Sequence, residues 1–371
     1  MPKVSIVLPT YNGEKYLKES LDSILRQTFI DWELIIVNDC STDGTQLIIN
    51  EYARRDNRIK VIINESNLKL PQSLNKGFDS ATGEYLTWTS DDNYYLDNAI
   101  HEMVYFLEKN KKYAMVCARM EIIDEIGKSI GSSIQYEKEE MLYNNRVGAC
   151  FMYRRKIKDL IGNYNSDFFL VEDYEYWLRI LFNREEIGWI DQILYRYRYH
   201  GKSLSFTKKK EICMQLTKLR KKYAYNICKY LKYNIKLLGA IYSEMFMLGE
   251  MDDNLKNRII TYIPEFSIIE EYDSERYIGV YGAGVYGRKI LEKKEKQILY
   301  FIDSDNSKIG KYIRNKQIKS FKQYVDEKKN EQLMIAVSTE KIGELVYELY
   351  HRGVRHCCLY SFLYKEINGY Q

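Results

Sequence analysis

The sequence predicts an α/β protein whose first half is built on a mostly parallel, doubly wound sheet. Turn-forming residues such as Asn12-Gly13 and the stretch NDCSTDGT separate apolar runs from segments with apolar residues at helical spacing. Strands that alternate with helices in this way pair in parallel, and ligands then bind beyond the carboxyl ends of the strands. The apolar runs that we expect to be strands are residues 4–8, 34–37, 61–63 and 85–89.

Each of the first three expected strands is followed by an expected helix, so the elements alternate through residue 89. The helical segments are residues 16–25, 46–54 and 73–80.

The pattern changes after residue 206. Residues 207–250 have the periodicity of long helices and carry the basic clusters 208–210 and 220–222. From residue 275 the stretch YIGVYGAGVYG predicts a strand, a glycine turn and the start of a helix, and ILYFIDSD and LMIAVST predict two further strands. We therefore expect three parts: 1–206, a helical connector at 207–274, and a small Rossmann-like α/β domain at 275–371.

Composition and charge limit the possible classes of protein. The 371 residues carry a net charge of +4, which gives no reason to expect a nucleic-acid partner. Seven cysteines without a C-x-x-C pair favour a reducing, cytoplasmic environment over a disulfide framework. The apolar run near the N-terminus is too short for a signal peptide, and no stretch has the roughly 20 apolar residues of a membrane span.

Polar residues follow several of the predicted strands. Thr10-Tyr11-Asn12, Asp39 and the doublet Asp91-Asp92 come directly after three of them. Two adjacent carboxylates repel each other unless a cation lies between them. They could cap a helix beginning near Leu96, bind Ca²⁺, or hold Mg²⁺ or Mn²⁺ against a substrate diphosphate. The regularly spaced oxygen ligands of a Ca²⁺ loop are missing, and the doublet alone leaves the other two open.

Two other carboxylate positions have more than one interpretation. Asp39 could accept hydrogen bonds from a nucleoside, or it could stabilise an Asx turn. Glu172-Asp173 precede an amphipathic helix and follow the aromatic pair Phe168-Phe169. A carboxylate there could cap the helix, or it could deprotonate a hydroxyl group.

The motifs VSIVLPTYN, VNDCSTDGT, ATGEYLTWTSDDNYY and VEDYEYWLRI occur in this order between about residues 3 and 205. Together they resemble family 2 glycosyltransferases of the GT-A fold. The resemblance implies an inverting transferase that moves a sugar from a nucleotide-diphospho-sugar, expected to be a UDP-sugar, to a hydroxyl of a saccharide or lipid-linked acceptor. Such enzymes serve the synthesis of cell-surface polysaccharides or glycoconjugates. The missing Q-x-x-R-W motif favours the addition of one or a few sugars.

The resemblance also implies roles for individual residues. Asp173 matches the general base, with Glu172 supporting it. Asp92 matches the ligand of Mn²⁺ or Mg²⁺, and His200 stands where a third metal ligand or a structural histidine is found. The residues expected to bind the nucleotide-sugar are Pro9, Thr10, Tyr11, Asn12, Asp39, Asn75 and Asp91.

Two positions depart from the family pattern. Ser90 replaces the more common first aspartate of the metal motif, and Leu74-Asn75 stands where many members have Arg-Asn. The second change removes a nucleotide contact that the arginine usually makes. In the stretch resembling the acceptor-side strand, Arg154-Arg155 would either meet phosphate or lie in a solvated turn.

The third part contains G-x-G-x-x-G at Gly282, Gly284 and Gly287, with Asp303 at the end of the next strand. This spacing is typical of a dinucleotide-binding turn, but the part is short, so a structural or oligomerising module that could form homo-oligomers is an equal alternative. The basic helices of the connector are expected to be a solvated spacer. Their alternative role is peripheral contact with the inner face of the membrane.

Two other functions remain open from the sequence. A catalytically inactive nucleotide-sugar-binding or regulatory protein would share the fold and the donor site. A sugar nucleotidyltransferase would share the sheet and the metal, although its usual glycine-rich turn is absent from PTYNGEKYL.

Overall fold

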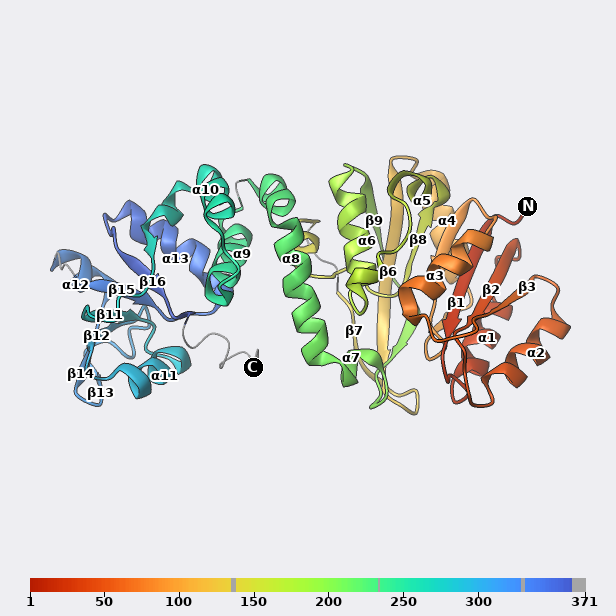
Figure 1. Cartoon of the computed structure of the whole chain (residues 1–371), viewed down its shortest axis with the longest axis horizontal. Coiled ribbons are helices and arrows are strands. Elements are labelled where there is room, and N and C mark those ends of the chain that lie inside the picture. The colour runs from red at the N-terminus through yellow and green to blue at the C-terminus, as the bar shows by residue number, and fades with distance from the viewer. Residues whose placement is uncertain (135–137, 233, 328–330, 362–371) are drawn as a thin grey trace. The chain divides into compact units, whose positions relative to one another are not determined.

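The computed structural model describes residues 1–134, 138–232, 234–327 and 331–361. It forms two compact units, Met1–Leu216 and Thr217–Gln371, each with its own sheet. In Figure 1 the first unit is coloured from red to green and the second from green to blue.

The first unit begins with alternating strands and helices and then adds longer strands that extend the sheet. The alternating part consists of β1 (Val4–Thr10), α1 (Leu17–Leu25), β2 (Trp32–Asn38), α2 (Thr45–Arg55), β3 (Ile59–Ile63), α3 (Lys69–Ser80), β4 (Tyr85–Trp88), β5 (Tyr94–Tyr95) and α4 (Ala99–Lys109). The later part consists of β6 (Tyr113–Ile123), β7 (Ser129–Ser132), η1 (Lys138–Leu142), β8 (Phe151–Arg154), α5 (Arg155–Ile161), η2 (Ser166–Phe168), α6 (Glu172–Phe182), β9 (Glu186–Arg198) and α7 (Leu204–Thr207).

The strands of the first sheet lie in the order β3-β2-β1-β4-β8-β6-β9-β5, with β7 paired to β6. β1 runs parallel to β2 and β4, whereas β8 is antiparallel to both β4 and β6. Thr10 lies opposite Asn38, and Val7 opposite Trp88. The carboxyl ends of three neighbouring strands therefore meet at one edge, and the predicted α/β class is confirmed.

Helices cover both faces of this sheet. Ile6 and Leu8 of β1 are fully buried on one face, in a core shared with α1, α2 and α4. On the other face, α3 lies against β1 and β2 through Gly77, where a Cβ would come within 2.4 Å of Val7 Cγ1 and 3.2 Å of Val37 Cγ2. Alternate residues of one strand thus pack on different helices, as the pleat requires.

The capping interpretation of the aspartate doublet is wrong. β5 follows the doublet, and the next helix, α4, begins only at Ala99 with Asn98 at its N-cap. Asp91 and Asp92 are therefore too far from the helix to satisfy its first N–H groups.

The second unit consists of a mostly parallel sheet, in which only the β13–β14 pair is antiparallel among the described strands, and its helices. Its strands are β10 (Ile269–Glu270), β11 (Ile278–Tyr281), β12 (Ile298–Ile302), β13 (Tyr312–Ile313), β14 (Lys316–Lys319), β15 (Gln332–Ile335) and β16 (Cys357–Leu359). Its helices are α9 (Ile235–Leu248), α10 (Asp253–Tyr262), η3 (Pro264–Ile268), α11 (Val285–Lys294), α12 (Phe321–Asp326) and α13 (Thr339–His351), while α8 (Lys209–Leu231) crosses the boundary between the units.

The strands of the second sheet lie in the order β10-β16-β15-β11-β12-β14-β13. Counted along the chain, β14, β12, β11, β15 and β16 have the order 3-2-1-4-5, which also occurs in dinucleotide-binding sheets. The apolar spacing of residues 321–329 also predicts a helix, of which the structure describes Phe321–Asp326, while residues 328–330 lie outside the described residues.

Helix α9, from the stretch expected to be a connector, packs within the second unit. A Cβ on its Gly239 would lie 2.2 Å from the Cα of Gly343 in α13. Across the described ranges, none of the helices has the combined length and hydropathy of a bilayer-crossing segment.

Candidate active site

The carboxyl ends of β1, β2 and β4 bring the predicted polar residues to one edge of the first sheet. Thr10 ends β1, and Asp39, which follows β2, donates its N–H to the Thr10 carbonyl oxygen at 2.9 Å. Thr89, which follows β4, donates its N–H to Val7 at 3.0 Å, so the doublet starts two residues beyond this hydrogen bond. The strand register thus explains why residues far apart in the sequence converge here.

Asp91 is enclosed by the turn that follows β1. The Thr10 hydroxyl donates a hydrogen bond to Asp91 Oδ2. Burial, followed by the negative charge of Asp92, raises the pKa of Asp91 to about 7. Gly13 allows this approach, because a Cβ there would lie 2.2 Å from Asp91 Oδ2. The carboxylate is thus held in a position where its charge is poorly compensated.

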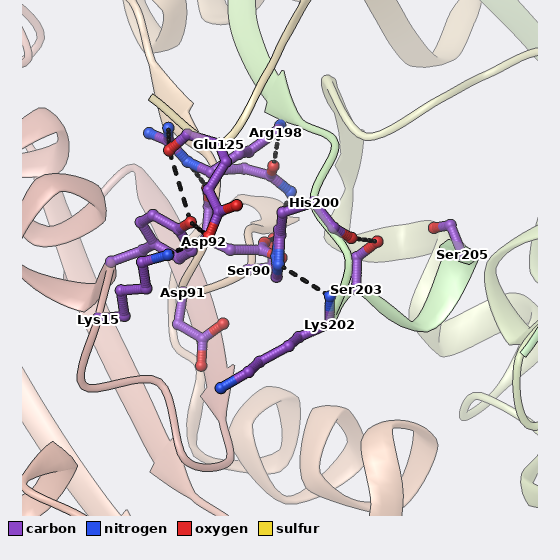
Figure 2. Close-up of polar contacts among 12 residues, drawn as sticks. Lys15, Ser90, Asp91, Asp92, Glu125, Arg198, His200, Lys202, Ser203 and Ser205 are labelled. Carbon is purple, nitrogen blue, oxygen red and sulfur yellow. Dashed lines mark hydrogen bonds and ion pairs between the residues drawn. The ribbon is translucent and has the colours of Figure 1, made fainter. Parts of the chain in front are cut away.

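Asp92 is bound from two sides. Ser90 Oγ donates to Asp92 Oδ1 at 2.6 Å, and His200 Nε2 lies 3.1 Å from Asp92 Oδ2. The Lys202 N–H donates to His200 Nδ1 at 3.3 Å, so Nδ1 accepts and Nε2 carries the proton that is donated to Asp92. Figure 2 shows this arrangement around the turn that follows β9.

Arg198 is a residue of this site that the sequence did not single out. Its side chain is only 2% exposed, and its Nε donates to the Asp92 carbonyl oxygen at 3.1 Å. Its other nitrogens donate to the Glu125 carbonyl oxygen at 3.1 Å and form an ion pair with Glu19. The guanidinium also lies 4.6 Å from the centre of the Tyr16 ring. Arg198 therefore fixes the main chain of the doublet against α1 and the β6–β7 turn.

Residues of the doublet partly fit a divalent cation. Asp92 offers a carboxylate that is 22% exposed, and oxygen ligands suit Mg²⁺ and Mn²⁺. His200 is held in the tautomer that donates to Asp92, whereas a metal would need the lone pair of Nε2. Within the described ranges no three His, Cys, Asp or Glu side chains form a ligand cluster. Such a donor set suits a cation completed by water and substrate phosphates.

Asp39 is buried and accepts several hydrogen bonds from its own fold. Asn64 Nδ2 and the Leu68 N–H each donate to Oδ1 at 2.8 Å, and the Lys69 N–H donates to Oδ2 at 2.9 Å. Asp39 therefore ties the β2 end to the start of α3. A nucleoside would add to these contacts through the remaining lone pair of Oδ2.

The other residues expected to bind the nucleotide-sugar have different surroundings. Pro9 is buried within β1, whereas the Tyr11 side chain is 50% exposed. Asn12 adopts a positive φ of 55° and accepts a hydrogen bond from the Thr42 N–H at 2.8 Å. The Asn75 amide both donates to and accepts from the main chain of Tyr164, at 2.9 and 2.8 Å.

Glu172 and Asp173 form the first turn of α6. Glu172 is 4% exposed, and its Oε2 atom is buried without a hydrogen-bond partner among the described residues. Burial and then the charge of Asp173 raise the pKa of Glu172 to about 8. Leu170, just before the helix, has a φ of 81°, a strained conformation for leucine. Val171, the N-cap residue of α6, makes no side-chain cap hydrogen bond, but Asp173 Oδ1 accepts the Tyr174 N–H of the first turn. The capping and general-base interpretations of Asp173 therefore both remain predictions.

Asp173 is partly exposed, and burial raises its pKa. Three donors oppose this effect: the Asn145 amide at 2.8 Å from Oδ2, the Tyr174 N–H at 2.6 Å from Oδ1, and the N–H of Asp173 itself. Burial also raises the pKa of Tyr197, and the charges of both Asp92 and Asp173 contribute to the rise. The two carboxylates therefore lie within electrostatic reach of one phenol group.

The model of the family "Glycosyl transferase family 2" matches residues 5–162. An uncharacterised glycosyltransferase of Haemophilus influenzae is 30% identical over 262 residues, covering 65% of this chain and 79% of that protein. The chain belongs to glycosyl transferase family 2.

This chain is also similar to the putative glycosyltransferase EpsE of Bacillus subtilis, with 42% identity over 127 residues. That match covers 34% of this chain and 46% of EpsE, so the chain spans less than half of that relative.

Solved structures show the same fold at low identity. Staphylococcus aureus TarS (residues 1–349) in complex with UDP-GlcNAc has a TM-score of 0.55 and 19% identity, covering 71% of this chain and 80% of TarS. The mannosyltransferase PcManGT of Pyrobaculum calidifontis in complex with GDP-Man and Mn²⁺ has a TM-score of 0.50 and 14% identity, covering 80% of this chain and 79% of that one. The expected GT-A fold is confirmed.

Both interpretations of the arginine pair are wrong in this family 2 protein. Arg154 Nε and Nη2 donate to the carbonyl oxygens of Tyr113 at 3.0 Å and Leu107 at 2.6 Å, and Arg155 Nε donates to that of Gly83 at 2.6 Å. Arg154 lies opposite Tyr85, the first residue of β4, and thus at the edge away from the doublet. The pair fastens the opposite edge of the sheet.

The family model ends before the second unit, where each predicted glycine has a distinct environment. Gly282 has a φ of 109°, and a Cβ on Gly287 would lie 2.0 Å from the Gly282 carbonyl oxygen. A Cβ on Gly284 would meet nothing within 4 Å. The first and third glycines are thus required by the turn and by helix packing, and the second leaves open space beside the backbone.

Asp303 is 7% exposed and is bound by its own unit. It accepts the N–H groups of Ala283 at 3.0 Å and Asp305 at 2.9 Å, and Lys308 Nζ lies 3.1 Å from its Oδ2. The structure therefore gives Asp303 a role in holding the glycine turn.

Proposed function

We propose that this protein transfers a sugar from a UDP-sugar to a hydroxyl of a saccharide or lipid-linked acceptor, with inversion at the anomeric carbon. The observation that carries the proposal is the presence of two carboxylate pairs whose members Asp92 and Asp173 both act electrostatically on the phenol of Tyr197. The doublet Asp91-Asp92 lies beyond β4, while the buried Glu172 and the partly exposed Asp173 begin α6. A donor diphosphate would occupy the first and an acceptor hydroxyl the second.

The fold and two neighbours support the donor class. TarS is solved with UDP-GlcNAc and PcManGT with GDP-Man and Mn²⁺. We propose that Thr10, Asp39 and Asp91 contact the nucleoside and sugar, together with the residues named from the sequence. The Asn75 amide is already hydrogen-bonded to the main chain of Tyr164, so it would have to give up one of these bonds to contact the donor.

Asp92 would hold a Mn²⁺ or Mg²⁺ ion, and His200 would join it only after giving up the hydrogen bonds that fix its present tautomer. When bound, the ion supplies positive charge next to the departing diphosphate. Arg198 keeps the main chain of Asp92 in place, and Ser90 orients its carboxylate.

Asp173 is the proposed general base. Its carboxylate takes the acceptor proton while the acceptor oxygen forms a bond to the anomeric carbon, and the bond to the diphosphate breaks with its electron pair. The attack comes from the face opposite the leaving group, which inverts the centre. Burial and the charge of Asp173 raise the pKa of Glu172, which favours the neutral form of Glu172 and so keeps a second negative charge away from Asp173.

The direct test measures UDP release from UDP-Glc, UDP-Gal, UDP-GlcNAc and UDP-GalNAc, with GDP- and dTDP-sugars as competitors for the donor class. Each donor is assayed with MnCl₂, with MgCl₂ and with EDTA. Release that requires the cation and favours UDP-sugars supports the proposal. Tight UDP binding without any release would favour the inactive, nucleotide-sugar-binding alternative.

For the second unit we propose nucleotide binding at the glycine turn, supported by the strand order and by the open space beside Gly284. Gly284→Ala folds normally, because its Cβ meets no atom within 4 Å. If the proposal is right, this variant loses nucleotide binding that Asp92→Asn retains. Calorimetry with UDP, UDP-GlcNAc and NAD⁺ measures both variants, and equal binding by Gly284→Ala and wild type contradicts the proposal.

A further inference from the structure

The proposed base is oriented by very few groups. Asp173 accepts one hydrogen bond from a side chain, that of Asn145, and one from the adjacent Tyr174 N–H. Among the described residues, no lysine or arginine forms an ion pair with Asp173 or with Glu172. The side-chain donor that can be changed without disturbing the main chain of α6 is therefore Asn145.

Asn145 comes from a separate segment, between η1 and β8. This segment is anchored on both sides of Asn145: the Asn144 N–H donates to the Glu140 carbonyl oxygen at 2.9 Å, and Val147 is 2% exposed. Gly148 has a φ of 72°, and a Cβ there would lie 2.4 Å from Met120 Cε. The asparagine is thus presented to Asp173 by a fixed turn.

Three acidic groups interact electrostatically with Asp173. They are Glu172, which precedes it on α6, Tyr164, which follows α5, and Tyr197 of β9. Each is anionic or neutral, so none of the three stabilises the ionised carboxylate. Arg146, the residue after Asn145, has Glu140 as an ion-pair partner at 3.6 Å. A neutral amide donor is what opposes the three acidic groups, since a hydrogen bond to the charged form favours that form.

We propose that Asn145 is a positioning residue for Asp173, whose amide fixes the carboxylate toward the acceptor hydroxyl in its ionised form. This inference rests on the proposed function for the base role of Asp173. The contact between the two side chains is independent of that role. Loss of Asn145 would leave the carboxylate both less oriented and more easily protonated.

The first test compares Asn145→Ala with Asn183→Ala, an exposed asparagine at the other end of α6 whose amide donates to a main-chain carbonyl. The probe is UDP release from UDP-GlcNAc with MnCl₂, with water as the acceptor. We expect the acidic limb of kcat/KM for Asn145→Ala to move up by about one pH unit, because hydrogen bonds to charged groups are worth about that much. UDP affinity and the Asn183→Ala profile stay at wild-type values. An unshifted limb in an active Asn145→Ala enzyme overturns the proposal.

A second measurement needs no substrate. Asn145 stabilises the ionised carboxylate, so its contribution to folding is present above the folded-state pKa of Asp173 and is lost as pH falls through it. The Tm deficit of Asn145→Ala is therefore larger at a pH above the folded-state pKa of Asp173 than at an acidic pH below it. In an Asp173→Asn background this pH dependence disappears. A pH-independent deficit in both backgrounds refutes the coupling.

The two failures can be distinguished. If wild-type protein releases UDP from no donor while the stability coupling holds, the proposed function fails and the Asn145–Asp173 contact stands. If UDP is released and the coupling is absent, the inference alone fails.

Discussion

In both sheets of this chain an aspartate lies just beyond the carboxyl end of a parallel strand: Asp91 and Asp92 after β4, and Asp303 after β12. The two sites differ in how the negative charge of these carboxylates is balanced. In the second unit, Asp303 has a lysine, Lys308, at 3.1 Å and two main-chain donors. In the first unit, neither Asp91 nor Asp92 pairs with a lysine or arginine side chain in the part of the chain that the structure describes. The charge of Asp303 is thus balanced within its own fold, whereas the proposed Mn²⁺ or Mg²⁺ would have to supply the balancing charge at the doublet.

This contrast predicts that neutralising a carboxylate removes sugar transfer in the first unit, whereas in the second unit it affects stability and the glycine turn but not sugar transfer. The largest effect is expected for Asp173→Asn, which removes the proposed base but keeps the size of the side chain. Its kcat should fall by about 10²–10⁴-fold, the range for loss of acid–base catalysis. UDP-release kinetics measure the loss, and calorimetry should show unchanged binding of UDP with Mn²⁺. If this variant turned over as fast as the wild-type protein, Asp173 could not be the general base.

Next in size is Asp92→Asn, which should weaken Mn²⁺-dependent UDP binding by about 100-fold or more, since even residues that only support a metal ligand alter affinity 10–100-fold. Asp303→Asn is the matched control at the other sheet and should bind UDP with Mn²⁺ in the first unit as wild type does. Electron paramagnetic resonance of Mn²⁺ follows the binding directly. If Asp92→Asn and Asp303→Asn lost Mn²⁺-dependent UDP binding equally, the proposed difference between the two sites would be wrong.

Two arginines of β9 sharpen the comparison within the first unit. Arg198 is 2% exposed and makes several hydrogen bonds, whereas Arg196 is 39% exposed and pairs with Glu121. Arg198→Met should lower the free energy of unfolding by about 2–3 kcal/mol, because it leaves buried acceptors unpaired. Arg196→Met should cost about 0–1 kcal/mol. Urea denaturation measures both, and similar losses would show that Arg198 has no special structural role.

The smallest effect is expected for Lys308→Met. This lysine is 39% exposed, so loss of its ion pair with Asp303 should change stability by only about 0–1 kcal/mol. The change should shrink further at high salt. A large, salt-independent loss would mean that the carboxylate of Asp303 depends on this cation as strongly as a buried pair does.

Much of the first unit could be predicted because its signals are local. The β-branched runs, the turn residues and the carboxylates after each strand all lie within a few residues of one another in the sequence. The register between β1, β2 and β4 then places Thr10, Asp39 and Asp91 at one edge without further information.

The contacts that could not be predicted link distant parts of the chain. Arg198 pairs with Glu19 across 179 positions, and the stretch RYRYH gives no sign of which arginine is buried. Asn145 reaches Asp173 from outside α6, and Asn75 is bound to Tyr164 at a separation of 89. The type of side chain determines which hydrogen bonds such a residue can donate, but only the tertiary structure determines which acceptor it reaches.

The glycine pair Gly239 and Gly343 limits where the chain can be divided. Because a Cβ on either residue would meet the backbone of the neighbouring segment, α9 and α13 are in main-chain contact. A cut at residue 274 would strip α9 from its partner and expose Leu238, Ile241 and Met245, all fully buried. A C-terminal fragment that keeps this contact must therefore begin before α9, which starts at Ile235.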